Sequence, residues 1–359
     1  MPKKTVVAAG HICLDITPVF PRDRVGTPET LLKPGALLRM DGVDVHTGGS
    51  VANTGLAMAF LGADVHLCGK VGQDEFGRMV LEILRRRGGN VQGMKMDPAA
   101  VTSYSVVLAL PGQDRIFLHA PGANDTFCRD DVDFSAVEQA DLFHFGYPPL
   151  MRRMYEEGGR ELVELFRQVK AMGVATSLDM AAVDPASQAA KTDWRELLGR
   201  LLPYVDIFLP SVEELCVMLG YPVSDREADL QKMAKELLTM GTKTVVIKCG
   251  AKGLYYETGS GDIPGVEGAV WHGRRGFQPA FAPEKLRSAT GAGDTCIAAF
   301  LTAMLEGRSV EDCARLAAAT GAVCVESYDA LSGLQPFEVL EEKMANGWGR
   351  EERYVSKPE

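Results

Sequence analysis

The sequence predicts an α/β fold: a doubly wound, mostly parallel sheet flanked by helices, with a small antiparallel β lid beside it. Short runs rich in β-branched residues alternate along the chain with stretches whose apolar residues recur at helical spacing. Some runs are apolar throughout, such as "IFL" at 207–209 and "VVI" at 245–247, which is typical of strands covered on both faces. Two segments break this alternation, and they predict the lid.

The expected elements of the sheet follow the chain in order. Strands are predicted at 5–16, 64–72, 140–146, 174–180, 205–210 and 243–250. Helices are predicted at 48–63, 74–89, 159–173, 211–220, 225–241 and 295–306, and several of them stop at glycines. Strands and helices in alternation predict parallel pairing. Each helix runs back along the sheet, so the next strand starts at the same edge as the strand before it.

The lid is predicted from residues 16–47 and 101–121. Residues 16–47 contain four prolines and a stretch of alternating apolar and polar residues. Within the second segment, residues 101–119 are predicted to form a hairpin that turns at Pro111-Gly112. Residues 258–287 are rich in glycine and proline, and we expect them to be irregular.

Length and charge limit the classes of function. The 359 residues fit one large domain, which we place at 1–340, followed by a charged tail at 341–359. The net charge of −10 argues against general binding to nucleic acid or an anionic membrane, so an anionic ligand needs a local positive site. We find no signal peptide pattern and no run near the ~20 apolar residues of a membrane helix, so we expect a cytoplasmic protein.

Cysteine and histidine residues give no sign of a metal centre. The eight cysteines form no CxxC pair, and we expect reduced, buried thiols. The spacing of His11, His46, His119 and His144 matches no metal motif, so packing or surface roles are expected. Arg115 and His119 are predicted on an exposed face of the lid hairpin, with contact to an anionic or hydroxyl-rich substrate as the alternative.

The string "TGAGDT" at 290–295 is the strongest candidate for chemistry. Gly291, Ala292 and Gly293 come just before a predicted helix, whose first turn offers amide N–H groups and a partial positive charge. Small residues let a phosphate approach these amides, so 291–293 are predicted to form an anion hole. Asp294 is then placed to accept the proton of an attacking hydroxyl. From this string alone, an acid that stabilises a helix start remains the alternative.

Several segments resemble, in order and spacing, those of the ribokinase (PfkB) carbohydrate kinase family. They are "GHICLD" at 10–15, "GGSVAN" at 48–53, "GKVGQDEFG" at 69–77, "PGAND" at 121–125, "LPSVEEL" at 209–215, "IKCGAKG" at 247–253 and "TGAGDT" at 290–295. The similarity runs from about residue 5 to residue 335. It implies a ribokinase-like fold and transfer of the γ-phosphoryl group of ATP to an alcohol, usually a primary hydroxyl of a sugar or a related compound.

The resemblance also implies roles for single residues. It makes Asp294 the general base, with Gly291, Ala292 and Gly293 as the anion hole. The implied substrate residues are Asp15, Gly48, Gly49 and Asn53; the implied nucleotide residues are Lys248, Gly250, Gly253 and Ser211; Glu214 would hold Mg²⁺ through water. Structural alternatives remain open: a strand-end acid for Asp15, a helix cap for Asn53, a surface lysine for Lys248, and a tight turn for Gly250 and Gly253.

The sequence departs from the family pattern at three places. Ser288 stands where the signature usually has an Asp that belongs to a monovalent-cation site, which puts K⁺ activation in doubt. Ser211 replaces the Asn of the family's NxxE segment. Ala318 and the pair Asp329-Ala330 replace residues near the adenine, so nucleotide preference is open. The base and its glycines are intact, and we expect an active kinase.

Three functions remain open at this point. The first is a sugar kinase using ATP and Mg²⁺, and the second is a nucleoside kinase, in which Phe117, Tyr104 or Tyr147 would stack on the base. The third is a protein that binds a phosphate ligand without turnover. The resemblance further implies a homodimer formed through the lid, whose edge strands would otherwise be exposed.

Overall fold

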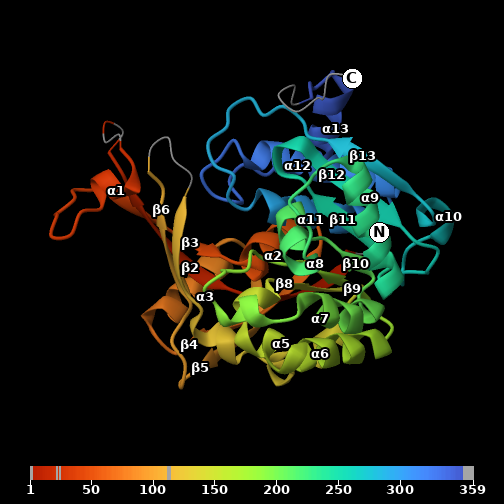
Figure 1. The fold of residues 1–359 in the computed structure, drawn as a ribbon, viewed down its shortest axis with the longest axis horizontal. Coiled ribbons are helices and arrows are strands. Elements are labelled where there is room, and N and C mark those ends of the chain that lie inside the picture. The colour runs from red at the N-terminus through yellow and green to blue at the C-terminus, as the bar shows by residue number, and fades with distance from the viewer. Residues whose placement is uncertain (1–2, 22, 24–25, 111–114, 351–359) are drawn as a thin grey trace.

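The computed structural model describes residues 3–21, 23, 26–110 and 115–350, which form a large sheet, a small sheet and covering helices (Figure 1). The large sheet has the strand order β13-β12-β11-β10-β9-β8-β1-β4-β5. Its strands are β1 (Thr5–Gly10), β4 (Asp64–Gly72), β5 (Asn90–Asp97), β8 (Leu142–Gly146), β9 (Ala175–Leu178), β10 (Ile207–Phe208), β11 (Thr244–Lys248), β12 (Gly253–Thr258) and β13 (Arg275–Pro279). All neighbours from β5 to β11 pair in parallel, and β12 and β13 add an antiparallel edge.

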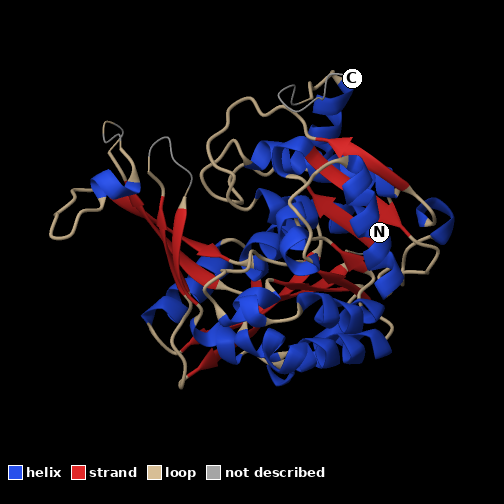
Figure 2. Cartoon of the chain, in the orientation of Figure 1, coloured by secondary structure: helices blue, strands red, loops and turns tan. Residues whose placement is uncertain are grey.

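Helices cover both faces of this sheet, as Figure 2 shows. Successive side chains of a strand point to opposite faces, so Val6 and Ala8 pack into one core and Val7 and Ala9 into the other. The first core is closed by α2 (Ser50–Phe60), α3 (Glu75–Arg86), α10 (Gly268–Trp271), α11 (Ala292–Leu305), α12 (Val310–Cys324) and α13 (Phe337–Ala345). The second is closed by α4 (Phe134–Glu138), α5 (Arg152–Tyr155), α6 (Arg160–Ala171), α7 (Trp194–Leu201), α8 (Val212–Leu219) and α9 (Glu227–Met240). The doubly wound, mostly parallel prediction is confirmed.

The strand order reverses direction at β1. The chain runs from β1 to β4 and β5 on one side, then returns to β8 on the other side of β1. In open α/β sheets, such a switch point leaves a crevice at the carboxyl ends of the strands, where ligands bind. The topology therefore indicates where a site belongs before any side chain is considered.

The lid is a four-stranded sheet that projects from the main body (Figure 1). It consists of β2 (Cys13–Val19), β3 (Gly42–Gly48), β6 (Tyr104–Leu108) and β7 (Ile116–Ala120), in the order β3-β2-β6-β7, and the short helix α1 (Pro28–Leu31) lies in the β2–β3 connection. The β2–β3 and β6–β7 pairs are antiparallel as predicted, but β2 and β6 are parallel. After β2 and β3 the chain adds β4 and β5 to the main sheet before it forms β6, so β6 enters the lid from the same end as β2. The predicted turn at Pro111-Gly112 lies outside the described residues.

Two other predictions differ from the structure. The single strand predicted at 5–16 is two strands in different sheets, because the chain turns at Gly10, whose φ is +127°. Residues 258–287 were expected to be irregular but contain β13, whose pairing with β12 extends the sheet. The predicted tail at 341–359 lies partly outside the described residues, and α13 continues into it as far as Ala345. Within the described ranges, no helix combines the length and the apolar character that a membrane span requires.

Candidate active site

A cleft of about 820 Å³ lies at the carboxyl ends of the main strands, facing the lid. Its polar lining follows one strand end after another: His11 after β1, Tyr147 after β8, Asp179 after β9, Ser211 shortly after β10 and Lys248 at the end of β11. This is the crevice that the switch at β1 predicts. Its volume suits a small molecule such as a sugar together with part of a nucleotide.

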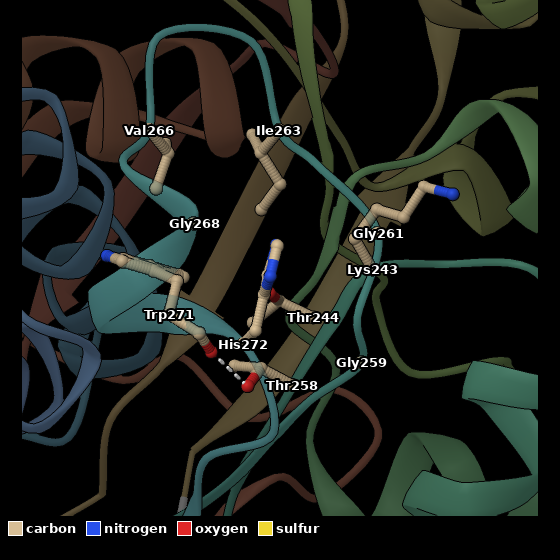
Figure 3. A pocket seen from close by; sticks show the side chains of 10 residues that line it. All are labelled: Lys243, Thr244, Thr258, Gly259, Gly261, Ile263, Val266, Gly268, Trp271 and His272. Atoms are coloured by element: carbon tan, nitrogen blue, oxygen red, sulfur yellow. Dashed lines mark hydrogen bonds between the residues drawn. The ribbon is translucent and has the colours of Figure 1, made fainter.

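A second cavity lies at the other end of β11 and β12, against α10 (Figure 3). It is lined by Thr244, Thr258, Trp271 and His272 among others, and the Thr258 hydroxyl donates to the carbonyl of Trp271. Its volume of about 10 Å³ is close to the space one water needs. It is therefore excluded as a site for a sugar or a nucleotide.

Asp294 lies in the first turn of α11 and lines the large cleft. The helix is preceded by Gly291, whose φ of +72° is in the left-handed region, and a Cβ there would overlap Ala330. Gly291 brings no side chain to cap the amides of the first turn. Gly291 and Gly293 line the cleft, whereas the Ala292 side chain is not part of its lining. The predicted anion hole and the predicted base thus face the same space.

Three side chains donate hydrogen bonds to the carboxylate of Asp294, which is only 4% exposed. Tyr147 Oη donates to Oδ1 at 2.7 Å and Asn53 Nδ2 to Oδ2 at 3.0 Å. Thr54 Oγ1 lies 3.4 Å from Oδ1. Burial raises the pKa of Asp294, and the hydrogen bonds from Tyr147 and Asn53 limit the rise. A buried carboxylate with a raised pKa beside open space is typical of a general base.

Lys248 is ion-paired inside the cleft. Its Nζ lies 2.6 Å from Asp179 Oδ1, and the two side chains are 13% and 1% exposed. Burial lowers the pKa of Lys248, but the carboxylates of Asp179, Glu214 and Asp294 outweigh this effect and raise it. The alternative of a solvated surface lysine is therefore wrong, and the cleft holds a charged ammonium next to Gly293, whose Cβ position would be 3.8 Å from Nζ.

Ser211 and Glu214 form a reciprocal cap at the start of α8. The Ser211 N–H donates to Glu214 Oε2 at 2.7 Å, and the Glu214 N–H donates to Ser211 Oγ at 3.3 Å. Both residues line the cleft, so the Glu214 carboxylate is held at its wall by the helix start. No group of three or more potential metal-ligating side chains occurs in the part of the chain that the structure describes.

The residues implied for substrate binding divide into two kinds. Asp15, Gly49 and Asn53 line the cleft, but Gly48 does not. A Cβ at Gly48 would overlap the Asp15 carboxylate, so this glycine makes room for it. Asn53 lies inside α2, whose N-cap is Gly49, and its amide is directed at Asp294. The helix-cap alternative for Asn53 is therefore wrong.

The glycines implied for nucleotide binding also divide. Gly250 lines the cleft at the end of β11. Gly253 does not; it opens β12 with a φ of +125°, and a Cβ there would overlap the carbonyl of Gln278. The turn that Gly250 and Gly253 form joins two antiparallel strands. Gly253 thus has a structural reason to be glycine.

The lid contributes side chains that sequence reasoning placed elsewhere. Arg115 and His119 line the cleft, which corrects their prediction on an exposed face. His119 Nε2 lies 3.3 Å from Nε2 of His11, and its Nδ1 lies 3.1 Å from Ser105 Oγ. Burial lowers the pKa of both His11 and His119, so the pair is neutral at pH 7. A neutral histidine pair thus connects the lid to the end of β1.

Sequence reasoning missed Asp179 and assigned Tyr147 only to base stacking. The missed signal was position: each is the first polar side chain after a buried parallel strand, at the edge where ligands bind. Of the other aromatic candidates, Phe117 lines the cleft, whereas Tyr104 packs edge-on against Phe76 and does not.

The sequence pattern of the pfkB family carbohydrate kinases matches residues 5–336. The chain belongs to this family. A 2-dehydro-3-deoxygluconokinase of Thermoproteus tenax is 30% identical over 296 residues, covering 81% of this chain and 83% of that protein. A ribokinase of Arabidopsis thaliana is 28% identical, covering 85% of this chain and 74% of its own. The PfkB assignment makes this protein a carbohydrate kinase.

Solved structures confirm the ribokinase-like fold. Arabidopsis thaliana ribokinase complexed with ribose and ATP superposes with a TM-score of 0.73 at 23% identity, covering 95% of this chain and 98% of that one. A putative ribokinase II from E. coli in complex with ATP and Mg²⁺ gives 0.72 at 21% identity, covering 96% and 99%. At these identities the likeness concerns the PfkB fold alone.

Proposed function

We propose that this PfkB kinase transfers the γ-phosphoryl group of ATP to a hydroxyl, preferably a primary one, of a sugar or sugar-like substrate. One observation carries the proposal: the Asp294 carboxylate is buried at the start of α11, faces the 820 Å³ cleft, and adjoins Gly291 and Gly293 there. A base and an anion hole in one wall are what phosphoryl transfer to an alcohol needs.

The proposed transfer gives each of these residues a role. The substrate hydroxyl gives its proton to Asp294 while its oxygen bonds to the γ-phosphorus, and the bond to the β-phosphate oxygen breaks with its electron pair on ADP. The amides at 291–293 and the Lys248 ammonium stabilise the negative charge on the transferring group. Asp15 accepts hydrogen bonds from substrate hydroxyls, and Ser211 and Gly250 face the nucleotide.

Glu214 fits as the protein ligand of a magnesium ion. The Glu214 carboxylate lies at the cleft wall, and one or two carboxylates suit Mg²⁺, which keeps several waters and takes further oxygens from phosphates. The ion supplies neutralisation of phosphate charge when it is bound. The chain's own contribution is the reciprocal cap with Ser211, which fixes the carboxylate.

A sugar is favoured over a nucleoside as the acceptor. The relatives quoted above are named for sugar substrates, one of them for a sugar acid. Of the three aromatic residues considered for stacking a base, Tyr104 lies outside the cleft, and the Tyr147 hydroxyl is bonded to Asp294. Arg115 and His119 on the lid suit an acceptor rich in hydroxyls or bearing a carboxylate.

The decisive experiment is Asp294→Asn. We expect kcat to fall by roughly 10²- to 10⁴-fold while nucleotide binding, followed by calorimetry, persists. A panel of sugars, sugar acids and nucleosides, read by ADP release with ATP and Mg²⁺, identifies the acceptor. A protein that only binds a phosphate ligand would release no ADP with any acceptor, and this variant would then leave its properties unchanged.

We also propose a homodimer that forms through the lid. Ile16 pairs with Val45 on one neighbour and Val106 on the other, and Val106 pairs with Leu118, so one apolar row crosses the sheet. Leu118 is 53% exposed, and a second copy would cover it. Light scattering should give twice the monomer mass, and Leu118→Glu should give the monomer. A cytoplasmic location remains a prediction from sequence.

A further inference from the structure

Tyr147 is one of two non-glycine residues with a left-handed backbone in the described part of the chain. Its φ is 67° and its ψ is 39°, and Pro148 follows it. This conformation is unfavourable for a bulky residue, and a following proline favours extended backbone instead. The packing around the end of β8 must therefore hold it there. As a result the half-buried ring lies in the cleft wall and its hydroxyl donates a hydrogen bond to the proposed base.

The two carboxylate oxygens of Asp294 accept different numbers of hydrogen bonds. Oδ1 accepts from Tyr147 at 2.7 Å and is approached by Thr54 at 3.4 Å, so both its acceptor positions are taken. Oδ2 accepts only from Asn53, at 3.0 Å, among the described residues. One acceptor position of Oδ2 therefore remains for a ligand in the cleft.

We propose that Tyr147 is a positioning residue that fixes the Asp294 carboxylate so that Oδ2 receives the proton of the attacking hydroxyl. The inference rests on the proposed function and deepens it. The hydrogen bond from a phenol is stronger to the ionised carboxylate than to the protonated one, so Tyr147 also favours the form that acts as a base. Asn53, which the sequence assigned to substrate binding, shares this role, because it donates a hydrogen bond to Oδ2 from α2.

Other ionisable groups lie near Tyr147 and Asp294 and also affect whether these two side chains are ionised. Lys248 favours the ionised form of Asp294, whereas Asp179 and Glu214 oppose ionisation of Tyr147. Removing the Tyr147 hydroxyl leaves these charges in place. The pKa of Asp294 then rises, because one hydrogen bond to its ionised form is lost while burial persists.

The test is Tyr147→Phe, measured as kcat, KM for ATP and the pH profile of kcat. We expect kcat to fall by about 10- to 100-fold at pH 7, less than the roughly 10²- to 10⁴-fold expected for loss of the base itself, because the base remains and only its positioning is lost. The KM for ATP should stay unchanged, and the acid limb of the profile should move to higher pH. Tyr221→Phe is the matched control, since it removes a 2.7 Å bond from Tyr221 to Glu236 outside the cleft. It should leave all three measurements as in the wild type.

A Tyr147→Phe enzyme with the wild-type kcat and acid limb overturns the proposal, as does a lower kcat with an unmoved acid limb. If the variant does not fold, 3-fluorotyrosine at position 147 keeps the shape and donates more strongly, so the acid limb should move to lower pH; an unmoved limb again overturns it. The variant Asp294→Asn distinguishes failure of this inference from failure of the proposed function. If that variant keeps its activity, the proposed function itself is wrong, whatever Tyr147 does.

Discussion

Lys248 Nζ lies 2.6 Å from Asp179 Oδ1, at the ends of two strands that are not neighbours in the sheet. The pair connects β9 to β11 across the end of β10 and places an ammonium beside Gly293. Burial raises the pKa of Asp179, and Lys248 opposes that rise. The contact therefore serves two purposes: it neutralises a buried carboxylate, and it holds a cation where the transferring phosphoryl group is expected.

Lys248→Met should lower both stability and activity. It leaves Asp179 buried without its partner, and such a loss costs about 3–5 kcal/mol in comparable buried pairs. Denaturant unfolding should show a fall of this size in the free energy of unfolding. The substitution also removes a cation from the proposed anion hole, so kcat of the folded variant should fall. Lys170→Met is the matched control, because Lys170 pairs with buried Asp206 away from the cleft. We expect it to lower stability without changing kcat; equal kcat values in the two variants would contradict the role of Lys248.

Alanine substitutions should distinguish the two glycines of the anion hole. Gly291→Ala forces a left-handed alanine into Ala330, so we expect a loss of stability of about 1–3 kcal/mol as well as of activity. Gly293→Ala meets only ordinary contacts near Lys248 and should fold normally. Its methyl group enters the cleft, so kcat should fall while the melting temperature is retained. An active Gly293→Ala enzyme would mean that phosphate does not approach the helix start closely.

The histidine pair His11 and His119 should make the protein less stable below about pH 6.5, the ordinary histidine pKa. Burial lowers the pKa of His11 and His119 in the folded state, so the unfolded chain binds more protons as pH falls through that value. Stability should decline by up to about 1.4 kcal/mol per pH unit for each such histidine. His119→Gln should flatten the decline, as measured by urea unfolding between pH 7.5 and 5.5. An unchanged slope would mean that His119 protonates freely in the fold.

Activity should not require K⁺. Ser288, at the position where the family usually has an Asp, accepts hydrogen bonds from Arg115 Nη1 at 3.3 Å and from the Thr290 N–H at 3.1 Å. A cationic side chain of the protein thus lies where a carboxylate would favour a metal cation. We expect equal kcat in potassium and tetramethylammonium buffers of matched ionic strength. Several-fold activation by K⁺ would show that a cation site persists without the acid.

Elements with strong local patterns were predicted well. The alternation of β-branched runs and amphipathic stretches gave the order of strands and helices around the main sheet, and "TGAGDT" located the start of α11. The failures share a physical cause. The break at Gly10 depends on close approach to Gly146, and β13 is a strand only because β12 offers an edge, so neither is encoded in its own segment.

The sequence by itself determined the fold class, the family resemblance and the candidates Asp294, Glu214 and Lys248, because these depend on periodicity and on spacing within short segments. Only the tertiary structure decided what each side chain contacts. Asn53 and Asp294 are 241 residues apart, and Tyr147 reaches the same carboxylate from a third segment. Such partners are set by how strand ends and helix starts meet at one edge of a sheet, which no single segment of the chain encodes.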